Sequence, residues 1–152
     1  MGEVELAALL CAFLSGSVAE TPQYFDVNGL RRHVRVDCET ETHVIEVGLD
    51  GKPSSRDSLH QALFFAHLTG KTPAVLLIDR DGFEGRYEYE MRQVTGATGV
   101  LYLRCSADLI NRWATTAPMR DGYYRGADDL PRNSHARTLC DLRPLAGGAA
   151  GS

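Results

Sequence analysis

The feature that most constrains the fold is the run AVLLID at residues 74–79, in which five apolar residues precede the first charge. A strand that is apolar at successive positions, and not only at alternate ones, is covered on both faces and lies in the centre of its sheet. Segments on both sides of this run, residues 54–68 and 84–97, carry apolar residues at helical spacing. A central strand between two helices predicts an α/β domain whose parallel strands are joined by right-handed crossovers.

The other expected elements surround this unit. Residues 33–38 and 42–49 alternate as half-buried strands do, and Asp50-Gly51 predicts the turn that follows them. The complete expectation is helices at 3–15, 54–68, 84–97 and 107–114, and strands at 24–27, 33–38, 42–49, 73–79 and 100–105. On the helix at 54–68, the residues expected to face the core are Leu59, Leu63 and Ala66, with His60, Gln61 and Phe64 to the side.

The first predicted helix has a competing interpretation. The run LAALLCAFL, followed by Ser17-Val18-Ala19, imitates the apolar core and the cleavage site of a secretory signal. The residues before it include Glu3 and Glu5, where a signal would carry lysine or arginine. We therefore favour a helix of the folded domain, and the signal stays as the alternative.

Length and composition predict one globular domain. With 152 residues, 43% of them hydrophobic, the chain can bury a substantial core in a single domain at 1–145. Residues 146–152 (AGGAAGS) are expected to be a disordered tail. No apolar run reaches the length of a membrane span, so no membrane is expected as a partner.

Charge gives a weaker indication about partners. The formal net charge of −4 weighs against tight non-specific binding to nucleic acid. Lys52 and Lys71 are the only lysines among 16 basic residues, and Arg31, Arg32 and Arg35 lie together. Arginine suits phosphate, although such a cluster is more often a solvated strand edge.

The cysteines predict neither a zinc site nor a redox motif. Cys11, Cys38, Cys105 and Cys140 form no CxxC pair. Their even number leaves disulfides open, but the first three lie in apolar runs that suit buried thiols. We therefore expect reduced cysteines and a cytoplasmic protein.

Two carboxylates are the strongest candidates for chemistry. An even-numbered hairpin loop somewhere around Glu39 to Glu41 places Asp37 on the same face as Val44 and Glu46, as a diagonal neighbour of Glu46 at about 7 to 8 Å. An odd-numbered loop places Asp37 on the opposite face. Glu46 lies in an otherwise apolar run, where a lone carboxylate is costly unless it has a partner or a metal.

Two other motifs do not hold. Gly70-Lys71-Thr72 resembles the end of a phosphate-binding loop, but the first glycine of that motif is replaced by Phe65. The tetrapeptide at 79–82 (DRDG) begins like a calcium-binding loop but lacks the later ligands, so a polar turn is expected.

The order helix, three strands, helix, strand over residues 3–105 resembles the PD-(D/E)xK nucleases, which include restriction endonucleases and RecB-like nucleases. Asp37 matches their metal-binding aspartate, Glu46 matches the first residue of (D/E)xK, and residues 61–65 (QALFF) are similar to the QxxxY helix. Glu20 matches an additional acid found in some members. The resemblance implies an α/β restriction-endonuclease-like core (αβββαβ) with a mixed central sheet flanked by helices. It also implies Mg²⁺ or Mn²⁺ held by Asp37, Glu46 and Glu20.

Three positions depart from the family pattern. Gly48 occupies the position of the lysine, no proline precedes Asp37, and Phe65 replaces the tyrosine. In such nucleases the lysine helps to activate water and to stabilise developing charge. Lys52 and Arg56 are the candidates to replace it, whereas Lys71 is expected to be too distant.

The sequence thus predicts a metal-dependent nuclease or phosphodiesterase acting on DNA or RNA. The predicted catalytic residues are Asp37, Glu46, Gln61, Lys52 and Arg56. The alternative is a nuclease-like domain that has lost its chemistry and serves as a binding or assembly module, which Gly48 and the acidic net charge favour. The oligomeric state is left open, a homodimer included.

Overall fold

A computed structural model describes residues 2–12, 14, 17–116 and 140–145. The predicted tail at 146–152 lies outside these residues. Within them the chain is an α/β structure with a five-stranded mixed sheet and four α-helices. The helices are α1 (Glu3–Ala12), α2 (Ser55–Thr69), α3 (Arg86–Thr98) and α4 (Ala107–Thr116), with a short 3₁₀ helix at Arg143–Leu145. The strands are β1 (Val18–Val27), β2 (Leu30–Glu39), β3 (His43–Leu49), β4 (Thr72–Asp79) and β5 (Leu101–Ser106).

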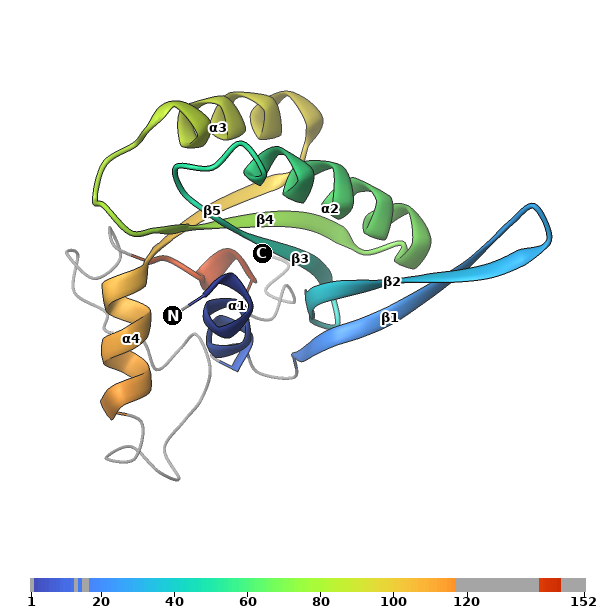
Figure 1. Ribbon diagram of the computed structural model, residues 1–152, viewed down its shortest axis with the longest axis horizontal. Coiled ribbons are helices and arrows are strands. Elements are labelled where there is room, and N and C mark those ends of the chain that lie inside the picture. Colours follow the sequence, from blue (N-terminus) through green and yellow to red (C-terminus); the bar gives the residue numbers. More distant parts are fainter. Residues whose placement is uncertain (1, 13, 15–16, 117–139, 146–152) are drawn as a thin grey trace.

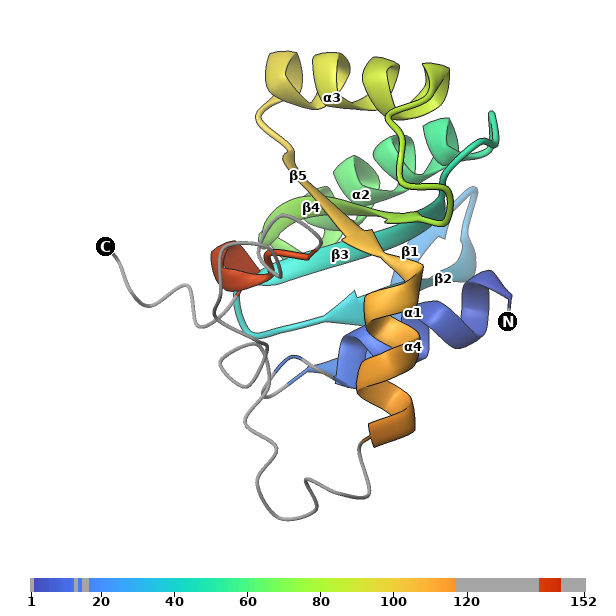
Figure 2. The ribbon, with the colours of Figure 1, turned by 90° about the vertical axis from the view of Figure 1, so that its left-hand side faces the viewer.

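The five strands lie in sequence order, with β1, β2 and β3 antiparallel and β3, β4 and β5 parallel. Helices α2 and α3 cover one face of the sheet, and α1 and α4 cover the other (Figures 1 and 2). In β4, Val75 and Leu77 pack on the α2–α3 side, while Leu76 and Ile78 pack on the α1–α4 side. The predicted central strand, covered on both faces, is therefore confirmed.

The prediction of a short strand at 24–27 is wrong in extent. Strand β1 begins at Val18 and pairs along its length with β2, and the two strands form a long ribbon that projects from the body of the molecule (Figure 1). Asn28 and Gly29 connect them with positive φ values of 52° and 76°, as a tight hairpin turn requires. Strand β1 has no buried residue, so its sequence lacks the alternating polarity by which a half-buried strand is recognised.

The buried face of α2 also differs from the prediction. Ser55, Ser58, Ala62 and Phe65 are buried, whereas Leu63 is 40% exposed. Small side chains let the helix lie close to β3, because Ser58 Oγ would be only 3.1 Å from a Cβ at Gly48. Of the three residues predicted to face the core, Leu59 and Ala66 are partly buried and pack at its edge, and only Leu63 is exposed. Close packing therefore centred the buried face on small residues beside the predicted ones.

The expectation of reduced cysteines is also wrong, because two disulfides are present. Cys11 of α1 is bonded to Cys38 of β2, and Cys105 of β5 is bonded to Cys140. Each pair joins segments that are distant in sequence and adjacent in the fold. Since disulfides persist in oxidising compartments, the cytoplasmic expectation loses the argument on which it rested. No helix in the described part of the chain has the length and apolar character needed to cross a membrane.

Candidate functional site

The candidate site lies at the point where β2 separates from β3. The two strands pair only at Cys38 with Ile45 and at Glu39 with Val44. Four residues, 40–43, connect the paired ends, so the loop is even-numbered. Continued by one step, the same register puts Asp37 opposite Glu46. The two acids are direct neighbours across the strands, where the sequence predicted a diagonal pair.

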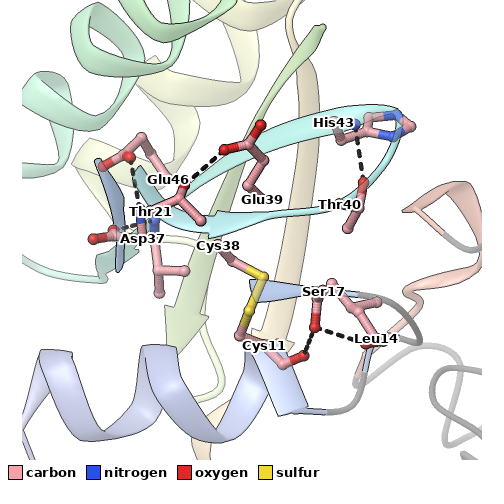
Figure 3. Close-up of a disulfide and its surroundings, with 11 residues drawn as sticks. Cys11, Leu14, Ser17, Thr21, Asp37, Cys38, Glu39, Thr40, His43 and Glu46 are labelled. Carbon is pink, nitrogen blue, oxygen red and sulfur yellow. Dashed lines mark hydrogen bonds between the residues drawn. A yellow bond between two sulfur atoms is a disulfide. The ribbon is translucent and has the colours of Figure 1, made fainter. Parts of the chain in front are cut away.

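The side chains of these acids bind the main chain of the opposite strand. The amide of Asp37 donates to Glu46 Oε1 at 3.2 Å (Figure 3). The amide of Val47 donates to Asp37 Oδ2 at 2.9 Å. In an unbroken antiparallel ladder, main-chain amides donate to carbonyl oxygens, whereas these two amides donate to carboxylate oxygens. The two hydrogen bonds hold both acids at the opening between the strands.

Near Asp37, both strands of the ribbon turn over, so that their side chains change faces of the sheet. This turn lies at Glu20 in β1, the third predicted acid. Val36 packs with Val44 and Phe65 on the α2 side of the sheet, yet Cys38, two positions later, is bonded to α1 on the other side. A regular strand would put both residues on one face, so β2 turns over at Asp37. In β1 the turn occurs at Glu20, which has a left-handed φ of 57° and lies between partners of residues 36 and 38.

Burial and mutual repulsion control the ionisation of the pair. Glu46 is 3% exposed, and burial raises its pKa to about 9, with further contributions from the charges of Asp37 and Glu20. Burial also raises the pKa of Asp37, although the hydrogen bond from Val47 opposes that shift. Two interacting acids titrate as a pair, and with a pKa of about 9 Glu46 keeps its proton at neutral pH.

The donor set fits a hard divalent cation. Asp37 and Glu46 each use one oxygen for a main-chain amide and keep a second oxygen that no described amide binds. Glu20 is exposed and its charge helps to raise the pKa of both acids, but among the described residues Glu20, Asp37 and Glu46 do not form a group whose oxygens all lie within 4.8 Å of one another. Carboxylate oxygens are the ligands that Mg²⁺ and Mn²⁺ prefer. A cation would displace the proton of Glu46 and remove the repulsion between the acids.

Gly48, which aligns with the lysine of the nucleases that the sequence resembles, has little room for a side chain. A Cβ at Gly48 would lie 3.0 Å from Leu77 Cδ2 and 3.1 Å from Ser58 Oγ. Both neighbours belong to packed elements, β4 and α2. Glycine at position 48, in place of lysine, therefore allows α2 to pack closely on the sheet.

The structure does not bring the other predicted site residues into contact with the pair. Gln61 is exposed on α2, and no hydrogen bond within the described residues joins it to either acid. Arg56 forms an exposed ion pair with Glu90, with Nε 2.6 Å from Oε1. Lys52 is exposed in the turn that precedes α2.

Sequence reasoning missed one ion pair on the same hairpin. Lys71 Nζ donates to Glu39 Oε2 at 2.6 Å and to the carbonyl of Thr40 at 2.7 Å. Burial opposes ionisation of Glu39, but the hydrogen bond from Lys71 prevails and lowers the pKa of that carboxyl. The parallel pairing of His43 with Thr72 brings Lys71 to this loop. In the sequence, the position of Lys71 just before the apolar strand was the feature that could have indicated this contact.

No family model matches the chain, and no curated protein or solved structure matches it either. The functional argument therefore depends on the geometry of the site.

Proposed function

We propose that the chain is a divalent-metal-dependent phosphodiesterase acting on DNA or RNA, with Asp37 and Glu46 as metal ligands. The observation that carries this proposal is the acid pair at the opening between β2 and β3, in which Asp37 is half-buried, Glu46 is buried, and the pKa of Glu46 is raised to about 9. Burial of two repelling acids destabilises a fold unless a ligand compensates for it. Strongly shifted acids of this kind are typical of functional sites.

Mg²⁺ or Mn²⁺ is the cofactor of the proposed enzyme, with Glu20 as an additional ligand. When bound, the ion supplies an activated water and withdraws charge from the scissile phosphate. Glu46 has to release its proton before it can act as a ligand, so metal affinity rises with pH up to about 9. The amides of Asp37 and Val47 keep the two carboxylates in place during this exchange.

The order α1, β1, β2, β3, α2, β4 supports a restriction-endonuclease-like core as part of the proposal. Lys52 is assigned the stabilisation of developing charge, because its amine has no ion pair among the described residues. Arg56 is the second candidate, since its exposed pair with Glu90 is worth little and can open. Arginine can stabilise charge there but cannot act as a base.

The β1–β2 ribbon provides a surface that suits a nucleic acid. Arg31, Arg32 and Arg35 are exposed on it, and the Arg31 guanidinium lies 4.6 Å from the centre of the Tyr24 ring. Arginine binds phosphate, and an exposed aromatic ring can stack on a base. Because β2 also contains Asp37, a nucleic-acid strand that binds along the ribbon would extend to the acid pair.

Hydrolysis of plasmid DNA, single-stranded DNA and single-stranded RNA, with Mg²⁺ or Mn²⁺ and with EDTA, tests the proposal. We expect metal-dependent cleavage that falls by more than about 100-fold in Asp37→Ala and in Glu46→Ala, because each substitution removes a ligand. Glu41→Gln, on an exposed residue of the adjoining loop, serves as the matched control and should cleave like the wild type. Absence of metal-dependent cleavage, or equal cleavage by the alanine variants, would refute the proposal.

The second candidate function is a catalytically degenerate binding or assembly module. The tight packing around Gly48 favours it, since a lysine at this position would have to displace the Leu77 and Ser58 side chains. Calorimetry with Mn²⁺ separates the two candidates. A Mn²⁺ site that is present in the wild type and missing in Glu46→Gln counts against the degenerate module.

A further inference from the structure

A second group of acids lies away from the Asp37–Glu46 pair. Oxygen atoms of Asp50, Asp81 and Glu88 all lie within 4.8 Å of one another. We call these three residues the acidic cluster. Asp50 follows β3, Asp81 follows β4, and Glu88 is in the first turn of α3. The cluster therefore lies at the carboxyl end of two parallel strands, where α/β sheets usually bind their ligands (Figure 1).

Glu88 is the member that points to a ligand. Its side chain is 1% exposed, and neither carboxylate oxygen has a hydrogen-bond partner within the described part of the chain. A buried carboxylate without partners is strongly unfavourable. The chain nevertheless makes room for it, because a Cβ at Gly85 would lie 2.8 Å from Glu88 Oε2.

The charges around the acidic cluster do not balance. Arg80 binds Asp50, with Nε 2.7 Å from Oδ1, and Arg104 binds the adjacent Asp79, with Nη2 2.8 Å from Oδ2. Asp81 and Glu88 have no cationic partner among the described residues. Two uncompensated carboxylates correspond to the charge of one divalent cation.

We propose that the acidic cluster binds one hard divalent cation of the Mg²⁺, Mn²⁺ and Ca²⁺ class. All its donors are carboxylate oxygens, which these ions prefer over softer metals. Asp81 is exposed and uses Oδ1 to accept the amide of Phe83, its other oxygen accepts no main-chain amide among the described residues, and water can complete the coordination shell. The ion joins the ends of β3 and β4 to the start of α3.

This site is separate from the proposed catalytic site. Asp50 is four positions after Glu46 along one strand, which corresponds to roughly 13 Å between their Cα atoms. Two-metal hydrolytic centres hold their ions about 4 Å apart. The acidic cluster therefore does not supply a second catalytic ion, and the inference does not depend on the proposed function.

Titration of the full chain with Mn²⁺, by calorimetry and by thermal unfolding, tests the proposal. We expect Mn²⁺ to raise the unfolding midpoint of the wild type, as any ligand of the native state does. Glu88→Gln and Asp81→Asn should each weaken binding at this site at least tenfold. Asp81→Asn is on an exposed residue and keeps an oxygen for Phe83, so it reports on the site even if Glu88→Gln alters folding. Glu84→Gln, an exposed acid of the same loop that is paired with Arg92, is the matched control and should bind like the wild type.

Glu46→Gln distinguishes this site from the catalytic one. Mn²⁺ binding that survives in Glu46→Gln but is lost in both cluster variants supports the inference, whether or not the chain hydrolyses phosphodiesters. If the wild type binds no Mn²⁺, or if Glu88→Gln and Asp81→Asn bind it as the wild type does, the inference is overturned.

Discussion

At the scale of single residues, Glu46 is the clearest departure from ordinary packing. All seven residues of β3 are buried, and Glu46 is the only one among them with a carboxyl group. It can stay there because the amide of Asp37 donates to it and because it retains a proton. The strand therefore accommodates an acid, but the free energy of unfolding then depends strongly on pH.

That dependence has a definite sign. The pKa of Glu46 is about 9 in the folded chain and has the ordinary value of 4.5 when unfolded. Below pH 4.5 both states carry the proton, so the side chain imposes no penalty. Between these two pKa values only the folded state keeps the proton. The free energy of unfolding therefore falls as pH rises, by up to about 1.4 kcal/mol per pH unit.

We expect Glu46→Gln to remove this loss of stability. In EDTA, the variant and the wild type should unfold at similar urea concentrations near pH 5, and the variant should become increasingly more stable toward pH 9. Urea unfolding at several pH values measures the difference, with Glu41→Gln as the control that follows the wild type. Parallel curves for Glu46→Gln and the wild type would contradict the assigned pKa.

At the scale of elements, α1 is joined to the sheet beside the candidate site. Leu6, Leu10 and Cys11 are buried on its inner side, and the disulfide to Cys38 binds the helix to the residue that follows Asp37 (Figure 3). Cys38 is also one of the last β2 residues paired with β3. The disulfide thus stabilises β2 close to the point at which it leaves β3.

We expect the double substitution Cys11→Ala/Cys38→Ala to lower the free energy of unfolding by about 3 to 4 kcal/mol, because it frees a 27-residue loop in the unfolded chain. Urea unfolding under oxidising conditions measures this loss. The wild type in reducing agent should be destabilised as well, whereas reducing agent should have a smaller effect on the double variant. Equal stability of the oxidised wild type and the double variant would contradict the assigned pairing.

At the scale of the whole molecule, stability is unevenly distributed. Residues 74–78 of β4 are 0% exposed and lie between two helical layers, whereas most of the β1–β2 ribbon is exposed. Elements with few buried contacts open more readily than the core.

We expect amide hydrogen exchange to show this difference. Residues 74–78 should exchange most slowly, with rates near those of global unfolding, and residues 26–31 at the end of the ribbon should exchange at least about 100-fold faster. Exchange measured by mass spectrometry, normalised to the rates of the unfolded chain, checks this. Equal protection of the two segments would show that the ribbon is held by contacts other than those described.

Much of the fold was predictable because it depends on local patterns. The run at 74–79 predicted a central strand, and Gly70 and Gly99 predicted helix ends that both adopt left-handed φ, at 75° and 72°. The hairpin pattern also predicted that Asp37 and Glu46 share a face if the loop is even-numbered, and the structure decided that parity. The strand and the helix ends involve residues close in sequence, so composition and spacing were sufficient to predict them.

Only the tertiary structure decided the features that depend on distant residues. It joined Cys11 to Cys38, left Gln61 exposed on α2, packed α2 closely against Gly48, and gathered Asp50, Asp81 and Glu88 from three segments. The sequence predicts a polar turn around Asp81, and the other two acids of the cluster come from the residue after β3 and from α3, where no spacing rule could locate them. Contacts between remote segments depend on how helices and strands pack in three dimensions, and that packing is not encoded in the periodicity of any one segment.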